Sequence, residues 1–470
     1  MITGSAFDGK RYAVLGLARS GGATVEALLA GGASVVAWDS NEAARNSLLP
    51  GTGRGTALEE RGGGGAPQAT SDEESPLHQP SAGPPPRAGE DLVVADPADL
   101  DLAGFAGIVV SPGVPLNRHP IRAQAATARV PIIGDIELFA QARAELPPHK
   151  VVGITGTNGK STTTALIEHI CRTAGLPALA GGNIGLPILG RDPLPAGGVY
   201  VLELSSYQID LTHSLDCDVA ILLNITPDHL DRYDGFAGYA ASKGRLFGMQ
   251  TPGHAAIVGI GDEASAAIAR EVAVGGRSQD LTKIAPGVCM DQSRWPALQG
   301  PHNAQNALAA IAACEALGIG RDAIDRGLAS FPGLAHRMER VAKRNGVLFV
   351  NDSKATNPTS AAPALAAFER IHWILGGVAK TDELDACRPG FGNVVKAYTI
   401  GEAGDLFSSI LEGEMPVERS GTLEAAVRSA ASQAKPGETV LLSPACASFD
   451  QFRDYEARGA AFRAAVEALG

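Results

Sequence analysis

Short apolar runs alternate with amphipathic stretches along most of the chain. The run at residues 11–17 is followed by a helical pattern at 24–32, and the run at 151–155 by another at 161–175. Apolar runs of this length, each followed by a helix-forming stretch, are typical of parallel strands covered by helices. The pattern therefore predicts an α/β fold with parallel sheets, which ends in a strand near 438–443 and a C-terminal helix.

Two proline-containing segments interrupt this alternation. The sequence ELPPHK precedes the strand-like run at 151–155, and a Pro-Gly turn in FPGLAHR follows a helical pattern. Proline and glycine pairs of this kind mark turns between structural elements. We therefore expect three domains, at residues 1–145, 146–333 and 334–470.

One segment of the first domain lacks the alternation altogether. Residues 51–90 hold 15 glycines and prolines in 40 positions, including GGGG and PPP runs. Such a composition buries little apolar surface and favours an extended or flexible chain. The sequence predicts a flexible surface insertion there.

Charge and hydropathy exclude several classes of partner. The chain has 470 residues, with 39 Lys and Arg against 51 Asp and Glu, for a net charge of −12. A net negative protein lacks the broad attraction to nucleic acid or anionic lipid that a basic surface provides. No run approaches the roughly 20 apolar residues of a membrane span, and the N-terminus lacks a signal-peptide layout. We expect a cytoplasmic protein that binds neither nucleic acid nor membrane.

Cysteine usage adds one further exclusion. The six cysteines are scattered, with no CxxC pair and no tight cluster. Disulfide frameworks and structural zinc sites both need such clustering. We interpret the cysteines as small core residues.

The sharpest chemical signal is the segment VVGITGTNGKSTTTALIEHI at 151–170. An apolar strand enters a glycine-containing turn, and a helix leaves it. Gly156 and Gly159 let backbone N–H groups face phosphate, Lys160 can reach the outer phosphates, and Ser161 can offer its hydroxyl to Mg²⁺. The general pattern GxxxxGK[ST] has glycine where this chain has Ile154. The segment therefore predicts a nucleotide triphosphate site with a variant phosphate loop.

Polar residues at predicted strand ends extend this site. Glu203 ends an apolar strand, and Asp228 and His229 follow another strand that ends at Asn224. Ligands of open α/β sheets bind at the carboxyl ends of the strands, and carboxylates suit Mg²⁺. Lys243 lies on a predicted helix, where a lysine is ordinarily solvated.

Several motifs occur together in one order along the chain. They are TGTNGKST, ELSSYQ, NITPDHLDRY, Lys243, GPHNAQNALAA at 300–310, HRME at 336–339 and NDSKATNP at 351–358. This set resembles the Mur ligase family, the ATP-dependent amide ligases of peptidoglycan precursor assembly. The motifs GDIELF and SPACASFDQFRDYEARG narrow the resemblance to members that use D-glutamate. It covers the whole chain except residues 51–90.

The resemblance implies a fold and a reaction. It implies an α/β protein with an N-terminal Rossmann-like domain, a central P-loop ATPase-like domain and a C-terminal Rossmann-like domain. The expected substrates are UDP-N-acetylmuramoyl-L-alanine, D-glutamate and ATP, and the carboxylate would be activated as an acyl phosphate before amide formation. The expected cofactor is Mg²⁺, with two ions, and we expect a monomer.

The resemblance also implies roles for residues of the nucleotide and metal site. Lys160, His229, Lys243 and Lys354 are the expected catalytic residues. The expected metal ligands are Ser161, Glu203, His229 and a carbamylated Lys243. The expected ATP-binding residues are Gly156, Thr157, Asn158, Gly159, Lys160, Ser161, Thr162, Asn303, Asn306, Arg337 and Asp352.

Two further substrate sites follow from the same resemblance. In the first domain, Gly16, Ala18 and Gly21 depart from a GxGxxG pattern, and Asp39 at a strand end suits a ribose, uracil or NAD contact. The expected UDP-sugar residues are Arg19, Ser20, Asp39, Ser40, Gly113, Asn183 and Ser205. The expected D-glutamate residues are Thr356, Lys380, Ser448, Phe449 and Tyr455, the last a position where many relatives have phenylalanine.

Other functions remain open at this point. A folylpolyglutamate-synthase-like ligase would add glutamate to a different carboxylate, but the first domain and SPACASFDQF favour the muramoyl substrate. A non-catalytic nucleotide sensor would not need Glu203, His229 and Lys243 together. An NAD dehydrogenase lacks its GxGxxG and leaves the phosphate loop unexplained.

Overall fold

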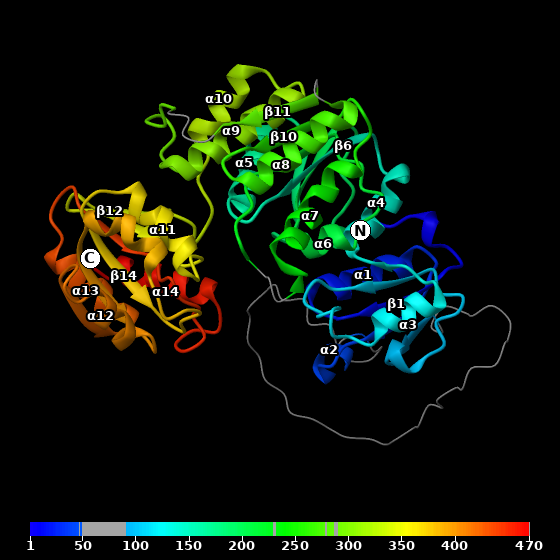
Figure 1. The fold of residues 1–470 in the computed structure, drawn as a ribbon, viewed down its shortest axis with the longest axis horizontal. Coiled ribbons are helices and arrows are strands. Elements are labelled where there is room, and N and C mark those ends of the chain that lie inside the picture. Colours follow the sequence, from blue (N-terminus) through cyan, green and yellow to red (C-terminus); the bar gives the residue numbers. More distant parts are fainter. Residues whose placement is uncertain (47, 49–90, 229–231, 278–279, 286–289, 470) are drawn as a thin grey trace, which may run out of the picture. The chain divides into compact units, whose positions relative to one another are not determined.

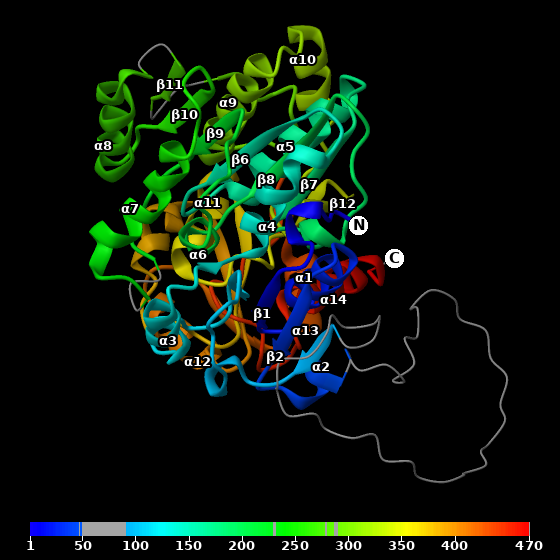
Figure 2. The same cartoon turned by 90° about the vertical axis from the view of Figure 1, so that its right-hand side faces the viewer.

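The computed structural model describes residues 1–46, 48, 91–228, 232–277, 280–285 and 290–469. The insertion expected at 51–90 lies outside the described residues. The described residues form two compact units, and both units are drawn in Figure 1 and Figure 2. The first comprises Met1–Leu146, Leu186–Pro193 and Asp210–Ser214, and the second Pro147–Gly185, Leu194–Ile209 and Leu215–Gly470. The three expected domain boundaries stay a prediction.

The first unit contains a five-stranded parallel sheet in the order β3-β2-β1-β4-β5. This is the strand order of a Rossmann fold. Its strands are β1 (Arg11–Leu15), β2 (Ser34–Trp38), β3 (Leu92–Val94), β4 (Gly107–Val110) and β5 (Ile132–Ile133). Its helices are α1 (Arg19–Ala30), α2 (Glu42–Asn46), α3 (Ile121–Ala128) and α4 (Asp135–Ala142). The apolar run at 11–17 thus forms the central strand, as its pattern predicts.

The second unit begins with a six-stranded parallel sheet in the order β11-β10-β9-β6-β8-β7. Its strands are β6 (His149–Thr155), β7 (Ala178–Gly182), β8 (Gly198–Glu203), β9 (Val219–Leu222), β10 (Ala255–Gly259) and β11 (Leu281–Ile284). Its helices are α5 (Lys160–Thr173), α6 (Ser206–Asp210), α7 (Gly235–Gly248), α8 (Glu263–Val272), α9 (Pro301–Ala316) and α10 (Arg321–Ser330). One core joins β6 to α5 and α9 through Ile154, Leu166 and Ala310.

A second six-stranded sheet follows in the same unit, in the order β12-β13-β17-β14-β15-β16. Only its edge pair β12 and β13 is antiparallel. Its strands are β12 (Glu339–Arg344), β13 (Val347–Asn351), β14 (Ile371–Gly376), β15 (Val394–Ile400), β16 (Val417–Gly421) and β17 (Thr439–Leu442). Its helices are α11 (Pro358–Ala367), α12 (Gly404–Leu411), α13 (Leu423–Gln433) and α14 (Tyr455–Glu467). The mixed α/β class and its three parallel-rich sheets confirm the fold predicted from the sequence.

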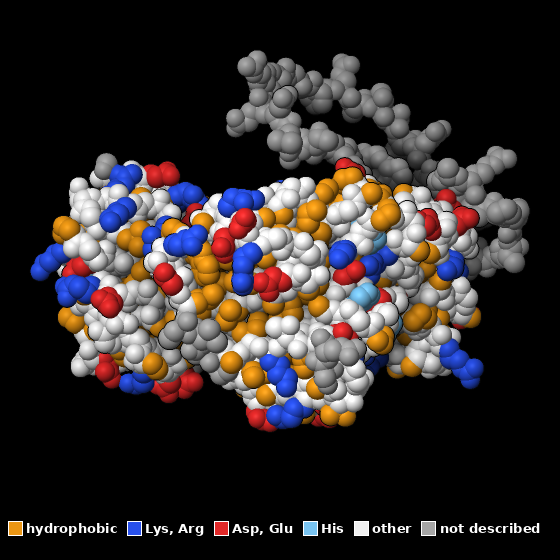
Figure 3. Space-filling model, turned by 90° about the horizontal axis from the view of Figure 1, so that it is seen from above, with side chains coloured by type: hydrophobic (Ala, Val, Ile, Leu, Met, Phe, Trp, Pro, Cys, Tyr) orange, Lys and Arg blue, Asp and Glu red, His pale blue; other side chains and the backbone are white. Residues whose placement is uncertain are grey.

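Two surface properties bear on partners. Within the described ranges, no helix combines the length and apolarity that crossing a bilayer requires. On the face drawn in Figure 3, basic and acidic side chains are interspersed among polar and apolar ones.

Five cysteines, Cys171, Cys217, Cys314, Cys387 and Cys446, are buried and not disulfide-bonded.

Candidate active site

The phosphate loop joins β6 to α5, and its shape depends on two glycines. Gly156 and Gly159 have φ values of +146° and +87°. Residues that carry a Cβ rarely adopt such backbone angles. A Cβ on Gly159 would also lie 2.3 Å from Asn306 Oδ1. Because α5 begins at Lys160, the unpaired amides of its first turn and its helix dipole favour an anion at this point.

Lys160 is folded back onto the loop that carries it. Its Nζ donates to the carbonyls of Gly156 and Thr157, each at 2.9 Å. Burial lowers the pKa of Lys160, with the Glu203 carboxylate opposing that shift. A phosphate oxygen would be a stronger acceptor for this ammonium than either neutral carbonyl, because both partners are then charged.

Arg337 reaches the same loop from the segment that precedes β12. It lies between His336 and Met338, whose φ values of 62° and 48° belong to the left-handed region. Its Nη2 donates to Ser161 Oγ at 3.1 Å, while its Nε is buried and has no hydrogen-bond partner within the described residues. Backbone strain that aims a guanidinium at a phosphate loop is typical of a functional position.

Glu203 ends β8 beside the loop with only 3% of its surface exposed. Its Oε1 accepts from Asn183 Nδ2 at 3.3 Å, whereas Oε2 is buried without a partner in the described part of the chain. A buried carboxylate oxygen without a donor is costly unless a cation compensates it. With the Ser161 hydroxyl it offers the hard oxygen ligands that Mg²⁺ prefers.

The second expected metal site is only partly described. His229 lies outside the described residues, so its expected role stays a prediction. Elsewhere in the described chain, no group of three His, Cys, Asp or Glu side chains is arranged to hold a metal.

Lys243 lies on α7 and is 1% exposed, unlike an ordinary surface lysine. Its Nζ donates to Gly156 O at 3.0 Å and lies 4.6 Å from the centroid of the Tyr239 ring. The Tyr239 hydroxyl is in turn 3.2 Å from Thr157 Oγ1. The structure therefore brings Lys243 to the phosphate loop, next to Gly156.

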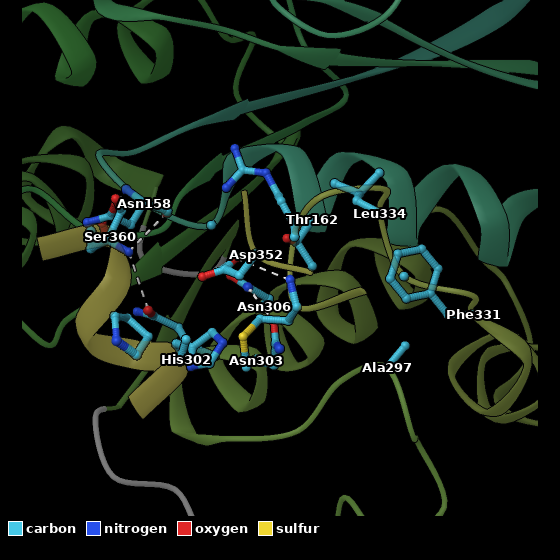
Figure 4. Close-up of a pocket in the computed structure, with 18 residues that line it drawn as sticks. Asn158, Thr162, Ala297, His302, Asn303, Asn306, Phe331, Leu334, Asp352 and Ser360 are labelled. Carbon is cyan, nitrogen blue, oxygen red and sulfur yellow. Dashed lines mark hydrogen bonds between the residues drawn. The ribbon is translucent and has the colours of Figure 1, made fainter. Parts of the chain in front are cut away.

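A pocket of about 760 Å³, open to solvent, adjoins the loop. Figure 4 shows that side chains of α5, α9, α11 and the segment at 331–338 line it. Asn303 and Asn306 lie on the α9 side, where Asn306 Nδ2 donates to Asn303 Oδ1 at 3.1 Å. Phe331 and Leu334 provide apolar walls. Its mixture of apolar walls and polar groups is typical of small-molecule pockets.

His302 also lines this pocket, although the sequence did not single it out. Burial lowers its pKa to about 4, so the imidazole is neutral at physiological pH. Its Nδ1 is buried without a hydrogen-bond partner among the described residues. The signal that could have identified His302 is its place in the motif GPHNAQNALAA, immediately before Asn303.

The loop after β13 contributes two residues with shifted pKa values. Burial raises the pKa of Asp352 to about 7. Hydrogen bonds from Ser443 Oγ at 2.8 Å and from the Met338 N–H at 3.2 Å oppose this shift, because they lower the pKa. Burial and the nearby Arg337 lower the pKa of Lys354 to about 8. Lys354 Nζ lies 5.1 Å from the centroid of the Tyr455 ring.

The residues expected for D-glutamate lie in loops around the carboxyl edge of the C-terminal sheet. Lys380 Nζ donates to Thr356 Oγ1 at 3.3 Å, so the structure brings these two together. Ser448 is buried, Phe449 is 73% exposed, and Tyr455 begins α14. Burial raises the pKa of the Tyr455 hydroxyl, which therefore stays protonated.

Arg458 is a residue of this edge that sequence reasoning missed. It lies on α14, is 1% exposed, and donates to Ser353 Oγ and to the carbonyls of Ser353, Cys446, Ala447 and Gly376 at 2.9–3.4 Å. These acceptors belong to the loops after β13 and β17 and to the last residue of β14. One guanidinium thus holds the loops that carry Lys354, Lys380 and Ser448.

The expected UDP-sugar residues are divided between the two units. Asp39, Ser40 and Gly113 follow the carboxyl ends of β2 and β4, and Arg19 and Ser20 are the first two residues of α1. Asn183 and Ser205 belong to the second unit, where Ser205 Oγ donates to Gln208 Oε1 at 3.0 Å.

Asp39 has local partners in the first unit. Its two oxygens accept from the backbone N–H groups of Leu17 at 2.6 Å and Asn41 at 2.8 Å. The Arg45 guanidinium donates to the Asp39 carbonyl at 2.7 Å and stacks 4.4 Å from the Trp38 ring centroid. Asp39 therefore fixes the turn after β1, where a ligand of a Rossmann sheet binds.

Two family models match the part of the chain that follows Leu146. The Mur ligase middle domain matches residues 154–282, and the Mur ligase, glutamate ligase domain matches residues 336–446. Among solved structures, a UDP-N-acetylmuramate–alanine ligase from Thermotoga maritima is similar with a TM-score of 0.55 and 15% identity. That similarity covers 98% of this chain and 100% of the other, and it supports the fold.

Curated relatives extend the similarity over the whole chain. A protein of Novosphingobium aromaticivorans is 60% identical over 100% of this chain and 97% of its own length, and one of Zymomonas mobilis is 53% identical over 100% of both. The chain therefore belongs to the Mur ligase family. Both relatives carry the name UDP-N-acetylmuramoylalanine–D-glutamate ligase.

Proposed function

We propose that this protein is an ADP-forming ligase that joins D-glutamate to UDP-N-acetylmuramoyl-L-alanine in peptidoglycan precursor synthesis. The observation that carries the proposal is the 53–60% identity, along the full chain, to relatives named for this reaction. The site supports it independently, because one unit contains a phosphate loop, a buried carboxylate oxygen with no partner among the described residues, and Lys354 and Lys380 in the loops of the C-terminal sheet. The cytoplasmic location and the monomeric state stay predictions.

The proposed reaction has two steps. A carboxylate oxygen of UDP-N-acetylmuramoyl-L-alanine attacks the γ-phosphorus of ATP, the P–O bond to ADP breaks, and an acyl phosphate forms. The amine of D-glutamate then attacks the acyl carbon, loses a proton, and expels inorganic phosphate. Each step brings anions together, so the protein contributes positioning and positive charge.

The cations of the loop region suit this task. Lys160 would exchange its two carbonyl acceptors for the β- and γ-phosphates, together with the amides of residues 156–162. Arg337 and Lys354 would approach the same phosphates from the other side of the pocket. Asn303 and Asn306, with Asp352 opposite them, would line the adenosine end.

Mg²⁺ fits the donor set, with Ser161 Oγ and Glu203 Oε2 as ligands of one ion and His229 proposed for a second. The bound metal neutralises phosphate charge and polarises the transferring group. Carbamylation would turn Lys243 from a buried cation beside Gly156 into an anion able to support the second ion. That modification is a proposal that rests on the family resemblance.

The two remaining substrates would bind at the other loops. Arg19, Ser20, Asp39, Ser40, Gly113, Asn183 and Ser205 are the proposed contacts of the UDP-sugar. D-glutamate carries two carboxylates, and Lys380 with Thr356 offers a cation and a hydroxyl at 3.3 Å for one of them. Ser448, Phe449 and Tyr455 are the remaining proposed contacts.

Phosphate release tests the proposed function. Purified protein with ATP, Mg²⁺ and UDP-N-acetylmuramoyl-L-alanine is compared with D-glutamate, L-glutamate, L-lysine or meso-diaminopimelate as the amine. Release with D-glutamate alone is expected. No release with any of the four would overturn the muramoyl assignment, and folate-type acceptors would then be tried.

The proposed carbamate has its own test. The variant Lys243→Ala is expected to lose activity and to regain part of it with short carboxylic acids, which supply the missing carboxylate. Failure of this rescue in a folded variant would contradict the carbamate role.

A further inference from the structure

Asn224, immediately after β9, binds the phosphate loop at three points, and no role proposed above uses it. Its Oδ1 accepts from the Asn158 N–H at 2.9 Å, and its Nδ2 donates to the Asn158 carbonyl at 3.2 Å. Its own backbone carbonyl accepts from the Thr157 N–H at 2.8 Å. We propose that Asn224 is a positioning residue that sets the shape of the phosphate loop before a nucleotide binds. Only the identity of that nucleotide, ATP, rests on the proposed function.

The loop needs such support because glycines flank the bonded residues. Gly156 and Gly159 give the segment conformational freedom that must be lost when phosphate binds. The Asn224 amide bonds both the N–H and the carbonyl of Asn158, so it restrains that residue from both sides. A loop ordered in advance binds its ligand without this entropic cost.

Gln305 supports the orientation of the Asn224 amide that the Asn158 N–H and carbonyl require. Its Nε2 donates to the Leu223 carbonyl at 2.8 Å, and a carbonyl can only accept. Gln305 Oε1 is thereby directed to Asn224 Nδ2, at 3.5 Å. The NH₂ of Asn224 faces Gln305, and its Oδ1 is left for the Asn158 N–H. The Leu223 carbonyl therefore orients the Gln305 amide, and the Gln305 amide faces that of Asn224.

The surroundings of Gln305 are adapted to this arrangement. A Cβ on Gly259 of β10 would lie 2.6 Å from Gln305 Nε2 and 2.2 Å from the Leu223 carbonyl oxygen, so only glycine allows the approach. Gln305 also lies on α9 between Asn303 and Asn306, which line the nucleotide pocket. The helix that lines the pocket thus also orients the residue that holds the loop.

Direct contact with the nucleotide is the competing explanation, because Asn224 and Gln305 themselves line the pocket. The two explanations differ in the protein without nucleotide. A positioning residue orders the loop there, whereas a contact residue acts only once the nucleotide has bound.

The test replaces Asn224 by leucine, which has a similar shape without hydrogen-bonding groups. Amide hydrogen exchange of the nucleotide-free protein is measured by NMR, and ATP binding by calorimetry. In Asn224→Leu we expect exchange at Asn158 to rise roughly tenfold and the Kd for ATP to rise by a similar factor, as for one or two lost hydrogen bonds. Exchange at Thr157 should change less, because its bond is to the backbone.

Asn393→Leu is the matched control. Its side chain is also half-buried and donates to a carbonyl, that of Leu365 at 2.9 Å, in the C-terminal part of the unit. This variant should leave exchange at Asn158 unchanged.

Gln305→Leu is the second variant. It tests whether Asn224 orders the phosphate loop if Asn224→Leu does not fold. It is expected to raise exchange at Asn158 by a smaller factor, since Asn224 remains but loses its orienting partner. Wild-type exchange at Asn158 in a folded Asn224→Leu, or in Gln305→Leu if that alone folds, would overturn the proposal even if ATP binding weakened. Failure of the ligase assay would leave this measurement on the nucleotide-free protein unaffected.

Discussion

The two six-stranded sheets of the second unit fix their loops in different ways. At the edge of the middle sheet, several groups share the phosphate loop: the neutral amide of Asn224, oriented with Gln305, binds Asn158, and the ammonium groups of Lys160 and Lys243 donate to the Gly156 carbonyl. At the edge of the C-terminal sheet, one buried cation, Arg458, bonds the loops after β13 and β17 and the end of β14. The Asn224 amide holds Asn158 without adding charge, and Lys160 can exchange its neutral carbonyl acceptors for a polyanion. A buried guanidinium adds positive potential to the edge where a dicarboxylate is proposed to bind.

Replacing the buried cation is the change expected to have the largest effect. Arg458→Met removes the hydrogen bonds that the guanidinium donates to four carbonyls and a hydroxyl, so the free energy of unfolding should fall by about 4 kcal/mol. Burial lowers the pKa of Arg458 to about 10, so the lost group is a cation at neutral pH. Thermal or urea unfolding followed by CD measures the loss.

Arg463→Met, on the same helix, is the control for this change. Arg463 is exposed and pairs with the mostly buried Glu339, which keeps its bonds from the His336 N–H and Asn351 Nδ2, so its removal should cost clearly less than that of Arg458. Arg458→Lys keeps the charge but cannot reach all of these acceptors, and it should stay folded with a raised KM for D-glutamate. Equal losses in Arg458→Met and Arg463→Met would contradict the contrast between the two edges.

Lys160→Met should separate function from stability at the other edge. Losing one charged donor to the transferring phosphate is expected to lower kcat by roughly 10²–10³-fold. The melting temperature should stay the same or rise, because the variant removes a cation whose burial already lowers its pKa. Phosphate release and thermal unfolding are measured together, and a large fall in melting temperature would show that Lys160 supports the loop structurally.

Asp352 should make stability depend on pH. Its pKa is about 7 in the folded protein against 3.8 for the free group, so the folded state keeps a proton that the unfolded state loses between these values. The free energy of unfolding of the wild type, relative to Asp352→Asn, should therefore fall as the pH rises from about 4 to 7, and then level off. Urea unfolding across this range measures the difference. A difference that does not change with pH would exclude the raised pKa.

Ser443→Ala should have the smallest effect. The Ser443 hydroxyl donates to Asp352 Oδ2 at 2.8 Å and lowers the pKa of that carboxyl. Its removal should raise the pKa further, by less than about one unit for one hydrogen bond. The pH at which the stability difference levels off should move upward in the same unfolding series, and a downward movement would contradict the assigned hydrogen bond.

Much of the fold follows from local patterns in the sequence. The apolar run at 151–155 and the glycines of TGTNGKST specify strand, turn and helix within 25 residues, and the structure has β6 and α5 there. The strand order of each sheet is set by pairing between distant segments, which periodicity along the chain does not encode. No pattern in the sequence indicates that Leu186–Pro193 and Asp210–Ser214 join the first unit.

Some residues of the candidate site can be identified from the sequence, and others cannot. Lys160, Ser161 and Glu203 are recognisable because their chemistry and their places at strand or helix ends coincide. Arg458 is missed because its partners are backbone carbonyls, which any sequence provides. Lys243 shows the same limit, since only the packing of α7 turns an ordinary helical lysine into a buried neighbour of Gly156.

The path of the chain through the first unit has a consequence for synthesis. Its last segment, Asp210–Ser214, is made well after Leu146, where the unit's main stretch ends. Leu211 of that segment packs in the same apolar core as Leu15 and Ile108, and its carbonyl accepts from the Gly134 N–H at 2.9 Å. At roughly 5–20 residues per second, a ribosome needs several seconds to supply it. Until then the first unit cannot complete its core, and the phosphate loop is translated within the same interval.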